Sequence, residues 1–309
     1  MKTRDLFQFI LISIFALTSC ETTEKIDDFP LRPSQLVVNC FFTEGGIWEF
    51  QVSKSLSVLD NAPLKLIDNA TIKLFKDSEL VETLSDPGGD TWYRSQNNLP
   101  EIGHEYSIEV SAPDFASLKA NEITPEAVPV SNVTAVIRDS TFYIWDNHYG
   151  GKSFGGKVEG YFNIMFSDPI GIENYYQLSI FYMDTTYNEE DSLDYDVSKN
   201  NLSVWSSDNS VEEGEGYNTN LLISDYLFDG QDYKLEVDFH EWRARKGRIY
   251  FIELTSITRS GYLYRRSIDE YSKAVNDPFA EPVKIFCNIE NGYGIFSGYA
   301  TEIYPVSFW

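Results

Sequence analysis

The sequence has few cysteines and histidines, which bind metal ions or act as nucleophiles and bases in many enzymes. It also has few positively charged residues. Its 309 residues include three cysteines, three histidines and 24 lysines and arginines, against 48 aspartates and glutamates, for a net charge of −24. Such an acidic chain repels phosphate backbones and anionic lipid headgroups, which argues against nucleic-acid binding and against membrane docking through basic residues. Hydrophobic residues make up 42% of the chain, so it can form folded domains with full cores.

Long apolar runs are also missing, apart from a short one near the N-terminus. Lys2 and Arg4 precede the stretch from Leu6 to Leu17, which only Gln8 and Ser13 interrupt. This stretch is too short to cross a membrane, because a helix needs about 20 apolar residues to span ~30 Å of hydrocarbon. It is typical of the hydrophobic region of a signal peptide, and we expect residues 1–19 to be that signal.

The residues that follow predict how the signal is processed. Leu17-Thr18-Ser19-Cys20 resembles the lipobox of bacterial lipoprotein precursors, in which lipid joins the cysteine sulfur before cleavage on its N-terminal side. The alternative is an ordinary secretory signal in which Cys20 is incidental. Two or more acyl chains on Cys20 would give stable membrane anchoring. The polar, acidic segment 20–33 then predicts a lipidated tether.

From Ser34 onward the hydrophobic pattern has a period of two. Trp48, Phe50 and Val52 alternate with polar residues, and similar runs occur at 70–74 and 106–110, as in half-buried strands. About six or seven short strands without a helical period favour an immunoglobulin-like β-sandwich over residues 34–125.

Residues 126–309 also have mostly strand patterns, and we expect a larger β-rich domain there. One helix is predicted near 260–275, where four apolar residues at spacings of four, three and four form a stripe: Tyr264, Ile268, Tyr271 and Val275. We expect this stripe to pack on a sheet. The predicted fold class is therefore mainly β, with an N-terminal immunoglobulin-like sandwich followed by a larger β domain with one packed α-helix.

Two cysteines remain once Cys20 is assigned to lipid. Outside the cytoplasm, Cys40 and Cys287 could form one disulfide. However, Cys40 alternates with Leu36, Val38 and Phe42 on one face of a predicted strand, which favours a small buried apolar side chain. The sequence leaves both alternatives open.

One short motif matches an esterase signature in the wrong context. Residues 151–155, Gly-Lys-Ser-Phe-Gly, fit the G-x-S-x-G pattern, in which the serine lies between a strand and a helix. The next segment, 158–166, has a strand pattern, so we interpret the motif as a glycine-rich turn. Hydrolysis at Ser153 with His148 or His240, or by two acids at glycosidase distance, is the enzymatic alternative.

The metal-binding patterns are incomplete. His104 and His240 each precede a glutamate, but neither has the second histidine three residues later that a zinc-protease helix needs. Six acidic residues between Asp184 and Asp196 could hold calcium. Their spacing lacks the order of a known calcium loop, which favours a solvated acidic excursion. We therefore predict no catalytic, cofactor-binding or metal-binding residue, and no cofactor.

Several segments carry a family resemblance. The matching segments are 36–42, 52–55, 106–113, 227–230 and, most specifically, 276–283 followed by 288–292 and 294–296. Together they resemble the Bacteroidota outer-membrane lipoproteins defined by the domain of unknown function DUF4249. Position 40, often glycine in that family, is Cys40 here. The resemblance implies no catalytic residues, but it implies a place beside TonB-dependent outer-membrane receptors.

We therefore expect a lipid-anchored protein of the outer membrane, on its periplasmic or cell-surface face. Its expected role is that of a non-enzymatic accessory or binding component beside a TonB-dependent uptake system. Surface adhesion or scaffolding is an alternative, and a secreted-type hydrolase is a second alternative. The sequence does not identify the ligand, the partner receptor or the membrane leaflet.

Overall fold

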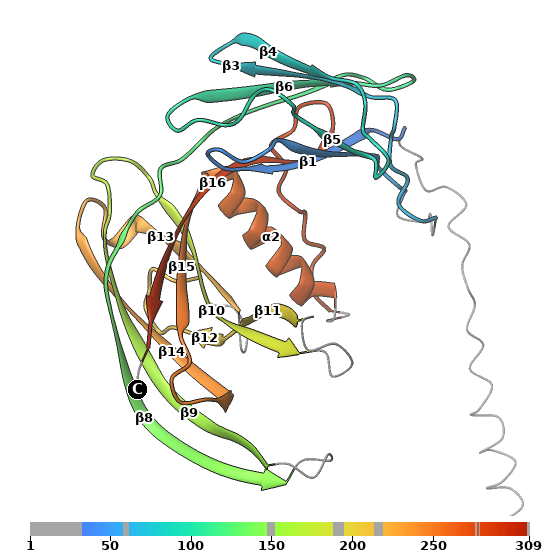
Figure 1. The fold of residues 1–309 in the computed structure, drawn as a ribbon. Helices are drawn as coiled ribbons and strands as arrows, with labels where there is room; N and C mark the ends of the chain where they lie inside the picture. The colour runs from blue at the N-terminus through green and yellow to red at the C-terminus, as the bar shows by residue number, and fades with distance from the viewer. Residues whose placement is uncertain are drawn as a thin grey trace, which may run out of the picture. The chain divides into compact units, whose positions relative to one another are not determined.

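The computed structural model describes residues 33–57, 62–146, 152–187, 195–212, 219–275, 277 and 279–307. Residues Ser34–Trp309 form one compact unit, separate from Met1–Pro33. Cys20 lies outside the described residues. The described part is mainly β and has one α-helix, α2 (Arg259–Val275), so the predicted fold class is confirmed (Figure 1).

The first β-sandwich is built from N-terminal strands and the last strand of the chain. One sheet contains, in spatial order, β16 (Tyr293–Val306), β1 (Leu36–Phe42), β2 (Glu49–Lys54) and β5 (Trp92–Arg94). The facing sheet has the order β4 (Glu79–Leu84), β3 (Thr71–Lys76), β6 (Glu105–Ser111) and β7 (Leu118–Ile123). The predicted alternation is present, because Val38, Cys40 and Phe42 are all at most 2% exposed. Cys40 and Cys287 are free thiols, and Cys287 packs against the same core.

The second β-sandwich surrounds a separate hydrophobic core. One sheet has the order β12 (Ser203–Trp205), β14 (Asp232–Ala244), β9 (Lys152–Ser167) and β8 (Val130–Asp146). The other contains β11 (Tyr195–Asn201), β13 (Asn220–Ser224), β10 (Tyr175–Tyr187), β15 (Tyr250–Ile257) and part of β16. Inward-facing side chains such as Phe162, Leu178 and Val237 fill the space between the sheets.

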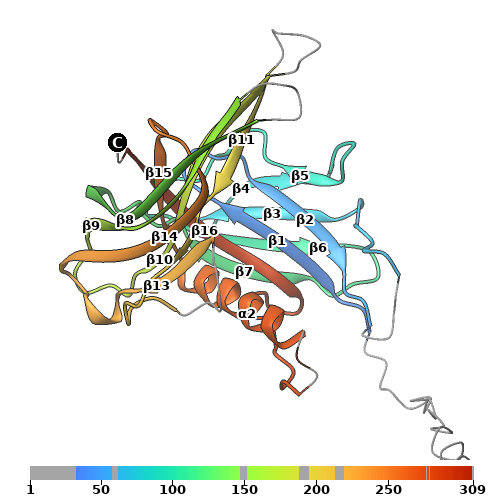
Figure 2. The ribbon, with the colours of Figure 1, turned by 90° about the horizontal axis from the view of Figure 1, so that it is seen from below.

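Strand β16 belongs to both sandwiches (Figure 2). Its residues 293–298 pair in parallel with β1, and its residues 299–306 pair antiparallel with β15. The last strand therefore completes the sheet that the first strand begins. The boundary predicted between residues 125 and 126 remains a prediction, and this pairing joins the two sides of it.

The close approach of β16 to its neighbour explains a glycine in it. Gly294 has a φ of +112°, and a Cβ atom there would lie 2.0 Å from the carbonyl oxygen of Val38 on β1. No side chain fits between the two backbones at that distance, and an L-residue would also be strained at this φ. Glycine is therefore required where β16 meets β1.

Helix α2 packs on the sheet, but not through the predicted stripe. Its buried residues are Gly261, Tyr262 and Ser267, whereas Ile268 and Val275 of the stripe are 37% and 62% exposed. The reason is close contact: a Cβ atom on Gly261 would lie 2.4 Å from the Oγ atom of Ser297 on β16. Gly261 therefore faces the strand. Of the stripe, Tyr264 is half-buried and packs on Phe41 of β1, whereas Ile268, Tyr271 and Val275 are exposed. Within the described residues, no helix has the length and apolar character that a membrane crossing requires.

The strand junction makes a direct prediction about stability. Substituting Gly294→Ala should destabilise the chain from residue 34 onward by about 3 kcal/mol or more, because overpacking and backbone strain act together. The control is Gly45→Ala, which also has a positive φ, of +66°, but no atom within 4 Å of the added Cβ. That control should lose only about 1–2 kcal/mol. Equilibrium unfolding in urea measures both, and equal losses would contradict the packing account.

Candidate functional site

Two loops run side by side from one sheet of the second sandwich to the other. Residues 168–174 connect β9 to β10, and residues 225–231 connect β13 to β14. Ser167 at the end of β9 pairs with Asp232 on β14, and Tyr175 on β10 pairs with Ser224 on β13. Because both ends of one loop start beside an end of the other, the strand pairing forces the loops together. We call residues 168–174 and 225–231 the paired loops.

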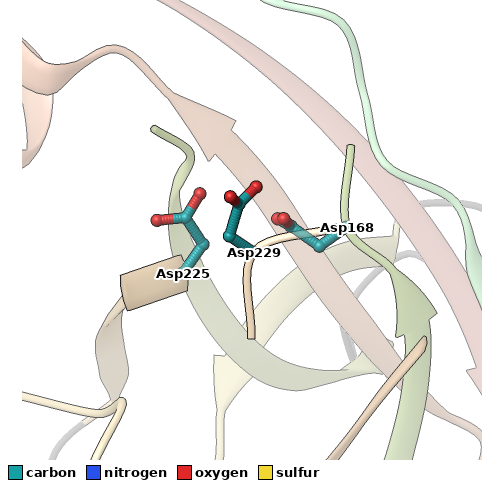
Figure 3. Close-up of side chains that lie close together, drawn as sticks. All are labelled: Asp168, Asp225 and Asp229. Atoms are coloured by element: carbon teal, nitrogen blue, oxygen red, sulfur yellow. The ribbon is translucent and has the colours of Figure 1, made fainter. Parts of the chain in front are cut away.

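Three aspartates of the paired loops point toward one another (Figure 3). Asp168, Asp225 and Asp229 each contribute a carboxylate oxygen, and these atoms all lie within 4.8 Å of one another. Asp168 and Asp225 are only 6% and 5% exposed, whereas Asp229 is exposed. Like charges at this separation repel one another, and burial weakens the screening by water.

Hydrogen bonds explain why these acids are tolerated. Each aspartate accepts a backbone N–H from the opposite loop, which fastens the paired loops to each other. The N···O distances are 2.9 Å from Gly230 N to Asp168 Oδ2, 2.6 Å from Asn174 N to Asp225 Oδ2 and 2.8 Å from Gly171 N to Asp229 Oδ1. Asp168 Oδ1 also accepts the hydroxyl of the buried Tyr176. The aspartates therefore have a structural role, whatever else they do.

Ion pairs among the described residues do not balance the charge of these carboxylates. None of the ion pairs formed by described residues involves Asp168, Asp225 or Asp229. Burial raises the pKa of Asp225; the N–H of Asn174 opposes that rise, and the charges of Asp168, Asp229 and Glu173 add to it. Asp225 is therefore a buried acid whose charge the surrounding protein does not neutralise.

A cavity of about 370 Å³ lies against the paired loops. Its lining consists of Gly171, Ile172, Glu173, Tyr175, Ser224, Asp225, Tyr226 and Asp229. Every charged residue in this lining is acidic, and two tyrosines supply aromatic surface. We call it the acidic cavity.

Exposed apolar side chains lie on the paired loops, and two of them, Ile172 and Tyr226, line this cavity. Ile170, Ile172, Tyr226 and Leu227 are 82%, 63%, 86% and 51% exposed, and we call them the apolar rim. Their neighbour Phe228 is 1% exposed, and its ring stacks on Tyr233 with centroids 3.8 Å apart. Phe228 thus anchors its loop in the core, while the rim faces water. Clustered apolar residues on a surface commonly mark an interaction site.

The geometry of the paired loops suits the binding of a positive group. The three aspartates could supply oxygen ligands to a hard cation such as calcium, which prefers six to eight oxygens at about 2.3–2.6 Å. The carboxylates and tyrosines of the acidic cavity could instead receive an organic cation.

None of the candidate site residues considered from the sequence lies in the paired loops. Cys20, the predicted lipid site, and His148 lie outside the described residues. In the acidic stretch 184–196, Asp184 pairs with Arg248 at 3.1 Å and Arg245 at 3.8 Å. The other acidic side chains of that stretch lie outside the described part, so calcium binding there stays open.

The residues of the esterase alternative are spread apart. The backbone of Ser153 belongs to β9, opposite Trp145 on β8. His240 pairs with Glu159 on the same strand β9, six residues further along, which corresponds to about 20 Å. His104 lies in the first sandwich and hydrogen-bonds Asp77 at 2.6 Å. The geometry therefore does not bring Ser153 and His240 together.

Sequence reasoning did not find the paired loops as a site. Asp168 lies in an Asp-Pro dipeptide, which is typical of a turn, and Asp229 lies in the segment 227–230 of the family resemblance. The missing information was the pairing of β9 with β14 and of β10 with β13. A sequence signal does exist, because an acidic residue begins each loop, Asp168 in one and Asp225 in the other.

Comparison with known proteins gives one match. A family model described as "Domain of unknown function (DUF4249)" matches residues 21–303, a range that includes both paired loops. No curated protein and no solved structure matches the chain.

The uncompensated charge of Asp225 predicts an unusual pH dependence. An acid whose pKa is raised by folding loses stability as pH rises from its unfolded value, about 4, through its folded value. Substituting Asp225→Asn keeps an oxygen for the Asn174 N–H and removes the charge. We expect the variant to be more stable than the native chain at pH 7, with a difference that shrinks as the pH falls toward 4.

Urea unfolding in EDTA at several pH values measures this difference. The control is Asp139→Asn, which removes one negative charge from an exposed position on β8 and should change stability by less than about 0.5 kcal/mol. A variant at position 225 that is less stable than the native chain at pH 7 would show that the carboxylate is compensated.

Proposed function

The chain belongs to the family of the domain of unknown function DUF4249, and from this membership we propose that it is a lipid-anchored, non-enzymatic binding component of the outer membrane. In this proposal lipid on Cys20 holds the protein on the membrane, and the folded part works beside a TonB-dependent uptake system. The lipobox resemblance at 17–20 and the family context support these two steps.

The observation that carries the proposed binding role is the apolar rim. Four large apolar side chains of the paired loops are 51–86% exposed, and two of them, Ile172 and Tyr226, line the acidic cavity. Leaving such side chains in water forgoes about 25 cal/mol for every Å² of apolar surface that could be buried. A partner that covers the rim recovers this free energy, and the paired loops are held in place for it by their mutual hydrogen bonds.

The geometry favours binding over catalysis at this end of the molecule. One oxygen of each aspartate already accepts a backbone N–H, which holds each carboxylate in a fixed orientation. That arrangement suits recognition of a positive group more than proton transfer. Elsewhere, the separation of Ser153 from His240 along β9 disfavours the esterase alternative.

The predicted tether is compatible with such a role. Residues 20–33 could span at most about 45 Å when fully extended. A membrane-embedded receptor next to the anchor would therefore be within reach, and anchoring on the same membrane would raise the effective concentration of the two partners.

Photocrosslinking in native cells tests the proposal. A photoreactive phenylalanine analogue in place of Tyr226 should crosslink to a TonB-dependent receptor, because this side chain is the most exposed of the rim. The matched control carries the analogue at Leu80 of β4, which is 55% exposed in the first sandwich. That position should give little or no receptor adduct.

A third chain combines the analogue at position 226 with Cys20→Ala. It should fail to incorporate labelled fatty acid and should lose most of the adduct, since it is no longer held on the membrane. The proposed function would be refuted if the lipidated protein gave no receptor adduct from position 226. It would also be refuted if positions 80 and 226 gave equal adducts.

A further inference from the structure

The acidic cavity and the apolar rim occupy the same two loops, so one occupant has to satisfy both. Four acidic residues belong to the paired loops: Asp168, Glu173, Asp225 and Asp229. No ion pair among the described residues neutralises any of them. Arg259 hydrogen-bonds the hydroxyl of Tyr175 and lines an adjoining cavity of about 510 Å³. The charge complement of this surface is a positive group.

Asp225 points specifically to such a group. It is 5% exposed and lines the acidic cavity. Its Oδ2 atom accepts the N–H of Asn174 at 2.6 Å, and no described residue donates a hydrogen bond to its Oδ1 atom. This second oxygen is open to the acidic cavity, so a donor that enters the cavity can hydrogen-bond it.

The size and lining of the cavity favour an organic cation over a bare metal ion. Its volume of about 370 Å³ falls in the range of small-molecule sites, about 300–1,000 Å³. Tyr175 is held in place, since its ring lies 4.6 Å from that of Tyr262 and its hydroxyl donates to Glu173 at 3.0 Å. Tyr226 on the opposite loop supplies a second ring. Aromatic rings and carboxylates together suit a guanidinium group, which stacks on rings and donates several hydrogen bonds in one plane.

We propose that the paired loops dock a segment of a partner protein by taking one of its arginine side chains into the acidic cavity, while apolar residues beside that arginine cover the rim. This inference rests on the proposed function, and it adds the chemistry by which the partner is recognised. The guanidinium donates to Asp225 and Asp229, and the rim residues Ile170, Ile172 and Leu227 exclude water around the ion pair.

Short peptides test the inference on the chain from residue 34 onward. The probes are the acetylated, amidated peptides Gly-Ile-Arg-Ile-Gly and Gly-Ile-citrulline-Ile-Gly, which differ in one charge at nearly equal shape. We expect the arginine peptide to bind about tenfold more tightly, because only the guanidinium carries the positive charge that pairs with the carboxylates. Titrations followed by amide chemical shifts give both affinities and should place the largest shifts in the paired loops.

Two variants separate the contributions of charge and rim. Asp229→Asn, at an exposed position, should abolish the preference for arginine over citrulline, whereas Tyr226→Ala should weaken both peptides. The exposed control Asp139→Asn should leave the preference unchanged. Circular dichroism checks that each variant is folded, and the comparison of the two peptides on the native chain needs no variant.

Equal affinities of the two peptides, or shifts away from the paired loops, would overturn the inference. So would tight binding of calcium chloride alone at the three aspartates that abolishes the arginine preference at equal concentration, since the site would then be a metal site. These failures are distinguishable from failure of the proposed function. A receptor adduct from position 226 without arginine preference would leave the binding role standing and remove only its proposed chemistry.

Discussion

The backbone of β16 pairs with β1 over residues 293–298 and with β15 over residues 299–306, and the rest of the fold depends on this double pairing. One sheet of the first sandwich is incomplete without β16, the last strand of the chain, which pairs with β1. In the second sandwich, β16 supports β15, which in turn pairs with β10 over residues 175–182. Since β10 begins directly after residue 174, these paired strands hold the end of the loop 168–174 in place. Small residues make the junction possible, with Gly294 facing β1 and Gly261 of α2 facing Ser297.

The paired loops show how such a scaffold can hold a surface that would not be stable alone. The pairing of their flanking strands brings three carboxylates within 4.8 Å of one another, and hydrogen bonds from the opposite loop hold them there. Phe228 anchors the second loop in the core. The carboxylates still repel one another, and a positively charged partner that binds between them would relieve this repulsion. The relief would contribute to the free energy of binding. The apolar rim adds surface that the same partner can bury.

Local sequence patterns predicted many of the strands and the helix, but they did not predict which strands pair. The period of two at Trp48, Phe50 and Val52 predicted strands, and the helix near 260–275 followed from its apolar spacing. The predicted helix face was wrong: the buried residues are Gly261, Tyr262 and Ser267, and Gly261 is the residue that lies against Ser297 of β16. The parallel pairing of β1 with β16 joins residues about 250 positions apart, and no local pattern encodes a partner at that distance. The paired loops were missed for the same reason, since their adjacency comes from strand pairing. The reading of Cys20 as a lipid site needs no tertiary information, and it remains a prediction.

The central structural claim is that β16 makes both sandwiches one cooperative unit that carries the paired loops. Native-state hydrogen exchange of the chain from residue 34 onward measures this most directly, because it gives an opening free energy for individual amides. The account predicts that the slowest amides of β1 and β15, the two neighbours of β16, exchange through the same global opening with the same free energy and denaturant dependence. The claim would be contradicted if the amides of β15 and β10 opened at much lower free energy while those of β1 and β6 stayed protected.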